Sequence, residues 1–222
     1  MLEFSLLQTK DGSPTIQSNQ YNATYHSIFG AIEESIHVFI SAGLYYQVNR
    51  GLKKIHIFEM GFGTGINAWL SCIEAMKYKI PVYYTSIEKH PLPSSIISKL
   101  SLHFQNHQMI TLFDKVHEAR WNEAIEINSY FHIIKVEEDI HNFHFKESFD
   151  VIYFDAFAPS CQPHLWELPL QSKLYNFVNK GGCLVTYCAQ GQFKRTLKEI
   201  GYKIDRLNGP NRKHEMTRGL KV

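Results

Sequence analysis

The residues from Glu59 to Gly65 combine a carboxylate with three alternating glycines, Gly61, Gly63 and Gly65. They stand between an apolar segment that predicts a buried strand and a segment that predicts a helix. Glycine adopts positive φ without strain, and it lets a ligand touch the main chain where a Cβ would collide. The pattern therefore predicts a loop that binds a small molecule through its backbone. A loop whose glycines serve only packing is the alternative.

The glycine spacing and the acids nearby indicate which ligand the loop could hold. A dinucleotide loop has the pattern G-x-G-x-x-G and binds a pyrophosphate, whereas here the third glycine comes one residue early. Glu59 suits a ligand with a cationic amino group, and S-adenosylmethionine carries an ammonium and a sulfonium. Glu88 ends the next predicted strand and can accept hydrogen bonds from ribose hydroxyls, and Asp139 can accept one from the adenine amine. S-adenosylmethionine is the predicted cofactor, with a dinucleotide as the alternative.

A second group of residues, Asp155 to Pro159, follows a strongly apolar segment that predicts another strand. Ligands of open α/β sheets bind at this carboxyl edge, where Asp155 could orient an amine and Phe157 could stack on a flat base. An alkylamine has a pKa of roughly 10, so a carboxylate is a poor base for its ammonium form and orientation is the expected role. Alternatively, Asp155 caps a loop and Phe157 fills the core. Trp166 could line the same pocket or belong to the core.

The elements that position these residues alternate along the chain from Lys54 onward, with short β-rich runs between longer helical stretches. This order predicts a doubly wound, mostly parallel α/β sheet with helices on both faces. The last two strands are separated by turn residues and predict an antiparallel hairpin at the edge. The predicted strands are Ile55–Glu59, Val82–Glu88, Phe131–Val136, Asp150–Asp155, Cys183–Tyr187, Tyr202–Leu207 and His214–Gly219. The predicted helices are Gly65–Lys79, Pro93–Phe104, Leu165–Asn179, ended by Gly181-Gly182, and Gly191–Ile200.

The N-terminal residues 1–50 are expected to form a small extension or lid on a main domain of residues 51–222, within one structural unit. Phe4–Leu7 and Thr15–Gln17 predict a β-hairpin in this extension, and Ala31–Ala42 predicts a helix.

Composition excludes several classes of protein. No apolar run approaches the roughly 20 residues that cross a bilayer, and no signal peptide is evident, so a cytoplasmic protein without a membrane partner is expected. The cysteines form no C-x-x-C pair, and His141 and His144 lack an evident third ligand, so no metal is expected. From Lys194 to Val222 there are nine Lys or Arg against three Asp or Glu. Such a basic segment can meet a polyanion or can simply be a solvated surface.

Together these residues resemble the methyltransferases that complete 5-methylaminomethyl-2-thiouridine at the wobble position of certain tRNAs. This family occurs as a stand-alone form, MnmD, which the sequence resembles, and as the methyltransferase half of bifunctional MnmC. The resemblance runs over nearly the whole chain. It is carried by Tyr25–Ser27, Gly30, Glu34–Ser35, Val38–Phe39, Glu59–Asn67, Ser86–Leu92, Phe154–Pro159, Pro163–Trp166, Thr186–Ala189 and Asn211–Met216.

The resemblance implies a class I S-adenosylmethionine-dependent methyltransferase fold, Rossmann-like, with the anticodon loop of tRNA as partner. It implies methyl transfer to the primary amine of 5-aminomethyl-2-thiouridine at tRNA position 34, with Asp155 and Phe157 as the catalytic residues. The implied cofactor-binding residues are Glu59, Gly61, Gly63, Gly65, Asn67, Glu88, Lys89, Asp139 and Asp155. The implied substrate-binding residues are Tyr25, Ser27, Glu34, Pro159, Trp166, Arg212 and Lys213.

The bifunctional proteins also carry a flavin oxidase domain, for which 222 residues leave no room, so action on the aminomethyl substrate alone is expected. Two other functions stay open. One is a methyltransferase or aminopropyltransferase-like enzyme acting on a small amine such as a polyamine. The other is a non-catalytic module that binds the cofactor or RNA. Methyl incorporation into tRNA and into free polyamines separates the three.

Overall fold

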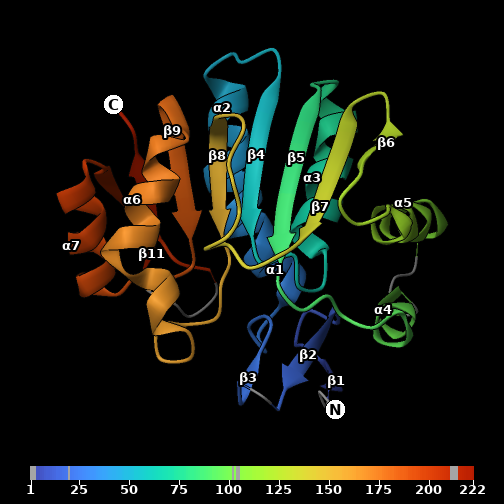
Figure 1. The fold of residues 1–222 in the computed structure, drawn as a ribbon. Helices are drawn as coiled ribbons and strands as arrows, with labels where there is room; N and C mark the ends of the chain where they lie inside the picture. The colour runs from blue at the N-terminus through green and yellow to red at the C-terminus, as the bar shows by residue number, and fades with distance from the viewer. Residues whose placement is uncertain (1–3, 20, 102, 104–105, 211–214) are drawn as a thin grey trace.

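The computed structural model describes residues 4–19, 21–101, 103, 106–210 and 215–222 (Figure 1). Within them, the main sheet has eight strands in the order β10-β11-β9-β8-β4-β5-β7-β6. The strands are β4 (Ile55–Met60), β5 (Val82–Glu88), β6 (Ala124–Asn128), β7 (Phe131–Glu137), β8 (Phe149–Phe154), β9 (Val178–Thr186), β10 (Lys203–Asn208) and β11 (Glu215–Leu220). The five central strands pair in parallel, and β6, β10 and β11 pair antiparallel. The predicted mostly parallel sheet with an antiparallel edge hairpin is confirmed.

Alternate side chains of the central strands enter two separate cores, one on each face of the sheet. Ile57 and Val151 belong to one core, and their neighbours Phe58 and Ile152 belong to the other. Because successive side chains of a strand point to opposite faces, a strand covered on both sides must be apolar along its whole length. This requirement explains the continuous apolar runs from which the strands were predicted.

Helices cover both faces (Figure 1). The segment of residues 31–49 packs on one face together with α3 (Ile66–Tyr78) and α5 (His107–Glu118), and α6 (Leu168–Asn176) and α7 (Gly191–Ile200) pack on the other. The segment comprises α1 (Ala31–Ser35), the π-helix η1 (Ile36–Leu44) and α2 (Tyr45–Asn49). A Cβ on Gly43 would lie 2.9 Å from the Tyr153 ring, so this helical segment lies tightly on the main sheet. Where the chain divides into units stays a prediction.

The region after β5 contains two helices where one was predicted. The stretch predicted at Pro93–Phe104 contains α4 (Ser94–Ser101), and α5 follows it as a separate helix that the prediction missed. Asn106 caps α5, since its side-chain oxygen accepts a hydrogen bond of 2.9 Å from the Gln108 amide.

The helix predicted at Leu165–Asn179 is wrong in its extent. It divides into the 3-10 turn η2 (Pro163–Trp166) and α6, and β9 already begins at Val178. Gly181 and Gly182 therefore lie inside β9 and do not end a helix. A Cβ on Gly182 would lie 2.9 Å from the Asp150 carbonyl oxygen, where the ladder between β8 and β9 shifts register. Glycine is therefore needed where the pairing of β8 and β9 is irregular and the two backbones approach closely.

A smaller antiparallel sheet precedes the main one and lies below its carboxyl edge in Figure 1. It contains β1 (Phe4–Gln8), β2 (Pro14–Ser18) and β3 (Ala23–Thr24). The predicted hairpin of the first two strands is confirmed, and the two-residue strand β3 was not predicted. None of the helices in the described part of the chain is long and apolar enough to span a membrane.

Candidate active site

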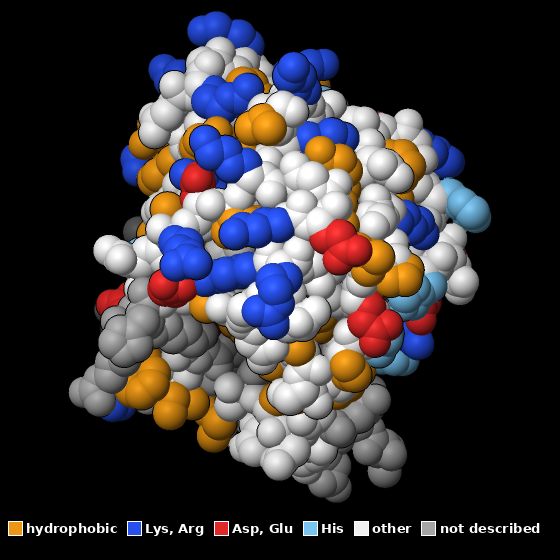
Figure 2. Space-filling model, turned by 90° about the vertical axis from the view of Figure 1, so that its left-hand side faces the viewer, with side chains coloured by type: hydrophobic (Ala, Val, Ile, Leu, Met, Phe, Trp, Pro, Cys, Tyr) orange, Lys and Arg blue, Asp and Glu red, His pale blue; other side chains and the backbone are white. Residues whose placement is uncertain are grey.

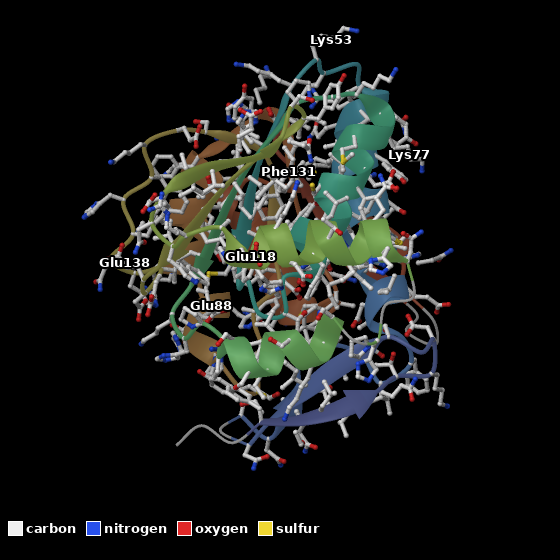
Figure 3. All side chains as sticks on the ribbon, turned by 90° about the vertical axis from the view of Figure 1, so that its right-hand side faces the viewer. Lys53, Lys77, Glu88, Glu118, Phe131 and Glu138 are labelled. Carbon is white, nitrogen blue, oxygen red and sulfur yellow. The ribbon has the colours of Figure 1, made fainter. Side chains whose placement is uncertain are left out.

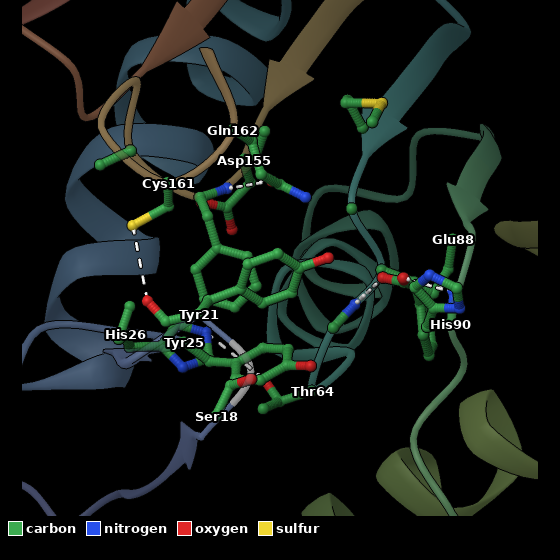
Figure 4. Close-up of a pocket in the computed structure, with 18 of the residues that line it drawn as sticks. Ser18, Tyr21, Tyr25, His26, Thr64, Glu88, His90, Asp155, Cys161 and Gln162 are labelled. Carbon is green, nitrogen blue, oxygen red and sulfur yellow. Dashed lines mark hydrogen bonds between the residues drawn. The ribbon is translucent and has the colours of Figure 1, made fainter. Parts of the chain in front are cut away.

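A cavity of about 790 Å³ opens at the carboxyl edge of the parallel strands, between the main sheet and the small N-terminal sheet (Figure 4). Its walls come from residues 17–18 and 21–28, the glycine loop after β4, the end of β5, residues 138–140, and residues 155–158, 161–162 and 164–165. Open α/β sheets bind ligands at this edge, and the volume suits a cofactor together with part of a substrate.

The glycine loop takes backbone conformations that other residues avoid. Gly61, Gly63 and Gly65 have φ angles of +91°, +50° and +71°. A Cβ on Gly61 would lie 2.9 Å from the Asp155 carbonyl oxygen, and one on Gly63 would lie 3.1 Å from the Tyr25 ring. The loop needs glycine both for its conformation and for its close contacts with two other walls of the cavity.

The acids predicted for the ribose and the adenine both line the cavity. Glu88 accepts hydrogen bonds from the amides of Gly63 (3.2 Å) and His90 (2.9 Å), and burial raises the pKa of its carboxyl. Asp139 accepts a hydrogen bond of 2.9 Å from the His141 amide and forms an ion pair of 2.9 Å with Lys89. These two partners lower the pKa of Asp139. Figure 3 shows Glu88 and Glu138 at the same edge of the molecule.

Glu59 lies beneath the loop, in a different environment from the other acids. Its side chain is fully buried and is absent from the cavity wall among the described residues. Ser86 donates a hydrogen bond of 2.6 Å to one carboxylate oxygen, while the other has no hydrogen-bond partner among the described residues. Burial raises the pKa of Glu59 to about 8, and the charge of Asp155 contributes to the rise. The carboxylates that do line the cavity are Glu34, Glu88, Glu138, Asp139 and Asp155.

Asp155 is fixed by the helix that follows the glycine loop. Asn67, in the first turn of α3, donates a hydrogen bond of 2.8 Å from its side-chain nitrogen to an Asp155 carboxylate oxygen. The Asp155 amide donates to the Met60 carbonyl oxygen at 3.1 Å. The side-chain oxygen of Asn67 is buried and has no hydrogen-bond partner within the described part of the chain. The site therefore retains an unused polar atom beside the cavity.

Phe157 presents an aromatic ring to the cavity beside Asp155. The centroid of its ring lies 4.6 Å from that of Tyr21 and 5.0 Å from that of Tyr25. Its amide donates to the Gln162 side-chain oxygen at 3.1 Å, and its carbonyl oxygen accepts a bond of 2.8 Å from the Trp166 indole. The amide and the carbonyl of Phe157 are thus both hydrogen-bonded, which fixes its backbone and orients the ring.

The other residues predicted to bind substrate divide into three groups. Tyr25, Ser27 and Glu34 line the cavity, and the nearly buried Glu34 carboxylate accepts a bond of 2.8 Å from the Ser27 amide. Pro159 and Trp166 are not part of the cavity wall that the described residues form. Trp166 is buried against Phe154 and Phe193, so it supports Phe157 from the core. Arg212 and Lys213 lie outside the described residues.

The cavity residues that were missed from the sequence include Tyr21, His26 and Gln162. The His26 ring lies 3.3 Å from the hydroxyl of Thr15 in β2 and 3.3 Å from that of Thr64 in the glycine loop. Burial lowers the pKa of His26 to about 4, so the neutral ring joins the small sheet to the loop at neutral pH. The resemblance carried by Tyr25–Ser27 pointed to this wall, but it did not single out Tyr21 or His26.

Comparison with known proteins shows to which family the chain belongs. Residues 101–222, more than half of the chain, match the family described as S-adenosyl-L-methionine-dependent methyltransferase. The chain belongs to this family. It is also 27% identical, over 95% of its length, to the tRNA 5-methylaminomethyl-2-thiouridine biosynthesis bifunctional protein MnmC of Marinomonas sp. (strain MWYL1), and 28% identical, over 91%, to that of Leptospira interrogans. It spans about a third of the length of these curated relatives, 32% and 33%.

Solved structures agree on the fold of this methyltransferase. The crystal structure of MNMC2 from Aquifex aeolicus superposes with a TM-score of 0.83 at 23% identity, covering 99% of this chain and 71% of that chain. The S-adenosylmethionine-bound amino pentose methyltransferase CalS10 from Micromonospora echinaspora gives a TM-score of 0.50 at 9% identity, covering 91% and 94%. The methyltransferase therefore has the class I fold, and the predicted family and cofactor are confirmed.

The residues of the cavity fit S-adenosylmethionine. The glycine loop leaves no space for a Cβ at Gly61, the carboxylate of Glu88 faces the cavity, and Asn67 keeps a buried oxygen without a partner. An amino acid ammonium, a ribose and an adenine offer donors to such acceptors. Among the described residues, no group of three or more His, Cys, Asp or Glu side chains could hold a metal ion.

Proposed function

We propose that this methyltransferase transfers a methyl group from S-adenosylmethionine to the 5-aminomethyl group of 5-aminomethyl-2-thiouridine at wobble position 34 of tRNA. The observation that carries the proposal is the placement of Asp155 and Phe157 side by side in the cavity, with Asp155 bonded to Asn67 of the helix after the glycine loop. The names of the relatives support the choice of nucleoside. We assign the activity to the cytoplasm.

The cofactor would be held by Glu59, Gly61, Gly63, Gly65, Asn67, Glu88, Lys89, Asp139 and Asp155. When bound, it supplies an electrophilic methyl group. Glu88 would accept the ribose hydroxyls, while Asp139, already paired with Lys89, would be at the adenine end. Glu59 lies buried under the loop and outside the wall, and its raised pKa keeps its carboxyl protonated near neutral pH. The ammonium of the cofactor would favour the ionised form of this carboxyl, because a nearby opposite charge stabilises a carboxylate.

Asp155 would position the substrate amine. A carboxylate is a weak base for an alkylammonium with a pKa of roughly 10, so the closed cavity must favour the neutral amine by excluding water. Asp155 then accepts an N–H hydrogen bond, directs the nitrogen lone pair, and stabilises the positive charge that develops on nitrogen. Phe157 would hold the base by stacking.

The remaining contacts to tRNA would come from Tyr25, Ser27, Glu34, Pro159, Trp166, Arg212 and Lys213, with Trp166 acting through the carbonyl of Phe157. Figure 2 shows Lys and Arg side chains gathered on the side of the molecule that carries α6 and α7. The exposed basic residues of this region include Lys180, Arg195, Lys198, Lys203 and Arg206. Such a surface suits the phosphates of an anticodon stem, which position RNA without reading its sequence.

The test incubates the purified protein and labelled S-adenosylmethionine with tRNA that carries 5-aminomethyl-2-thiouridine, followed by nucleoside analysis. We expect 5-methylaminomethyl-2-thiouridine, and we expect Asp155→Ala to lose it while Glu123→Ala, which replaces an exposed acid outside the cavity wall, retains it. Parallel reactions contain putrescine or spermidine. Methyl transfer to these amines and not to tRNA would show that the substrate is a small amine. Cofactor binding without any transfer would favour a non-catalytic module.

A further inference from the structure

Three aromatic rings from two distant segments meet in the cavity. Tyr21 and Tyr25 flank the short strand β3, and Phe157 follows β8. The Tyr21 and Phe157 rings lie 4.6 Å apart at 32°, close to a stacked arrangement, and Tyr25 meets Phe157 edge-on at 73°. Figure 4 shows Tyr21 and Tyr25 grouped on the side of the cavity facing Asp155. The small N-terminal sheet thus supplies a ring to one face of Phe157.

Tyr21 lies where a flat substrate ring on Phe157 would also have to lie. Unpaired bases bind proteins by stacking on such aromatic faces, often between two side chains. A ring brought to Phe157, with its amine at Asp155, must either share the Phe157 ring with Tyr21 or displace it. Tyr21 and Phe157 both line the cavity, so both rings are accessible to a ligand there.

The connection that carries Tyr21 allows such an adjustment. It joins β2 to β3, and these strands pair over only Gln17–Thr24 and Ser18–Ala23. Asn22 has a φ of +45°, a left-handed conformation that asparagine tolerates. The Tyr21 carbonyl oxygen accepts a bond of 3.8 Å from the Cys161 thiol, which is a weak donor. The contacts described for Tyr21 and Asn22 are therefore short of a long ladder that would fix the Tyr21 ring.

We propose that Tyr21 is a base-stacking residue that clamps the flat ring of the substrate against Phe157 while the amine reaches Asp155. This inference rests on the proposed function and names the residue that selects a ring-bearing amine. A ring sandwiched between the two would set their centroids about 7 Å apart, twice the ~3.4 Å spacing of stacked bases. The clamp therefore opens by roughly 2 Å from its present separation. An alkylamine offers no ring and gains nothing from Tyr21.

The experiment measures the Kd of two anticodon stem-loop RNAs that differ only at position 34, one with 5-aminomethyl-2-thiouridine and one with an abasic site. Fluorescence anisotropy is recorded for the wild type, Tyr21→Ala, Tyr21→Phe and Tyr78→Ala, where Tyr78 is a control tyrosine with 43% exposure at the end of α3. We expect the wild type, Tyr21→Phe and Tyr78→Ala to bind the base-containing RNA more tightly than the abasic RNA. The ratio of the two Kd values should be about tenfold smaller in Tyr21→Ala. Thermal melting checks the fold, and Tyr21→Leu replaces Tyr21→Ala if the latter fails to fold.

The outcomes separate this inference from the proposed function, because methyl transfer is measured on the same RNA. Equal preference in the wild type and Tyr21→Ala overturns the clamp even if transfer is normal, and so does a wild type without any preference. A preference that depends on Tyr21, in a wild type that transfers no methyl group, keeps the clamp and refutes the assigned reaction.

Discussion

Asn67 donates a hydrogen bond of 2.8 Å to Asp155 and thereby joins the first turn of α3 to the end of β8. The helix that continues the glycine loop thus positions the carboxylate of the substrate segment, by which we mean Asp155–Pro159. Hydrogen bonds to a charged acceptor are stronger and more directional than neutral ones. The Asn67 side chain therefore helps to align the two halves of the candidate site.

Replacing Asn67 by alanine should lower kcat on the order of tenfold or more, because a hydrogen bond to a charged group contributes about 1.5–3 kcal/mol. Asn179→Ala is the matched control. It removes an equivalent Asn–Asp bond of 2.8 Å, to Asp150 at the other end of β8. We expect it to reduce stability while leaving kcat unchanged. Steady-state kinetics and urea unfolding of both variants decide, and equal kcat losses would show that Asn67 acts only through stability.

Gly61→Ala should weaken S-adenosylmethionine binding by at least tenfold, because its Cβ would lie 2.9 Å from the Asp155 carbonyl oxygen. The variant also places alanine at a φ of +91°, which costs about 1 kcal/mol in stability. Gly51→Ala isolates that second effect, since Gly51 has a φ of +82° with nothing within 4 Å of an added Cβ. The affinity for S-adenosylmethionine is measured by calorimetry. An unchanged affinity in Gly61→Ala would contradict the view that the cofactor needs glycine at this position.

The buried carboxyl of Glu59 should make stability depend on pH. Its pKa rises from 4.5 to about 8 on folding, so between these values the folded protein keeps a proton that the unfolded chain releases. The free energy of unfolding therefore falls as pH rises from about 5 to 8. Glu59→Gln removes this contribution, so the variant should gain stability relative to the wild type at pH 8 and match it near pH 5. The free energy of unfolding of both proteins is measured by urea unfolding from pH 5 to 8. The same pH dependence in Glu59→Gln and in the wild type would refute the assignment.

If the exposed basic residues on the side of α6 and α7 contact tRNA phosphates, tRNA binding should weaken with salt in a way that depends on them. Arg195 and Lys198 are exposed on α7, so replacing both by alanine should reduce the slope of log K against log salt by about 1 to 2. Lys53→Ala with Lys77→Ala is the control pair, because both lie at the end of the molecule opposite Glu88 (Figure 3). Slopes that fall equally in the two double variants would indicate a nonspecific charge effect.

The strands and the cofactor loop could be predicted from sequence because each leaves a pattern within a short segment. The alternating glycines around Gly61 and the continuous apolar runs of β4 and β8 are such patterns, although the contacts that require them are long-range. Asp155 and Phe157 follow a strand, so their place at the carboxyl edge follows from the parallel pairing of that strand.

Long-range packing explains what the sequence could not show. Tyr21 and His26 enter the site only because the small sheet docks on the glycine loop and on Phe157, and no local pattern encodes this contact. A carboxylate at Glu59 has the same sequence signature whether it faces a ligand or lies beneath the loop. Trp166 likewise follows the substrate segment in the chain but points into the core.

The placement of β11 imposes an order on the synthesis of this protein. β10 joins the main sheet through β11, which is translated after it and is inserted between β10 and β9. On the ribosome, residues 203–208 must therefore wait for the strand that follows them, and the outer edge of β9 stays open to other strands during that interval. An open strand edge of this kind can pair with strands of other chains, so β9 is exposed to aggregation until β11 is made.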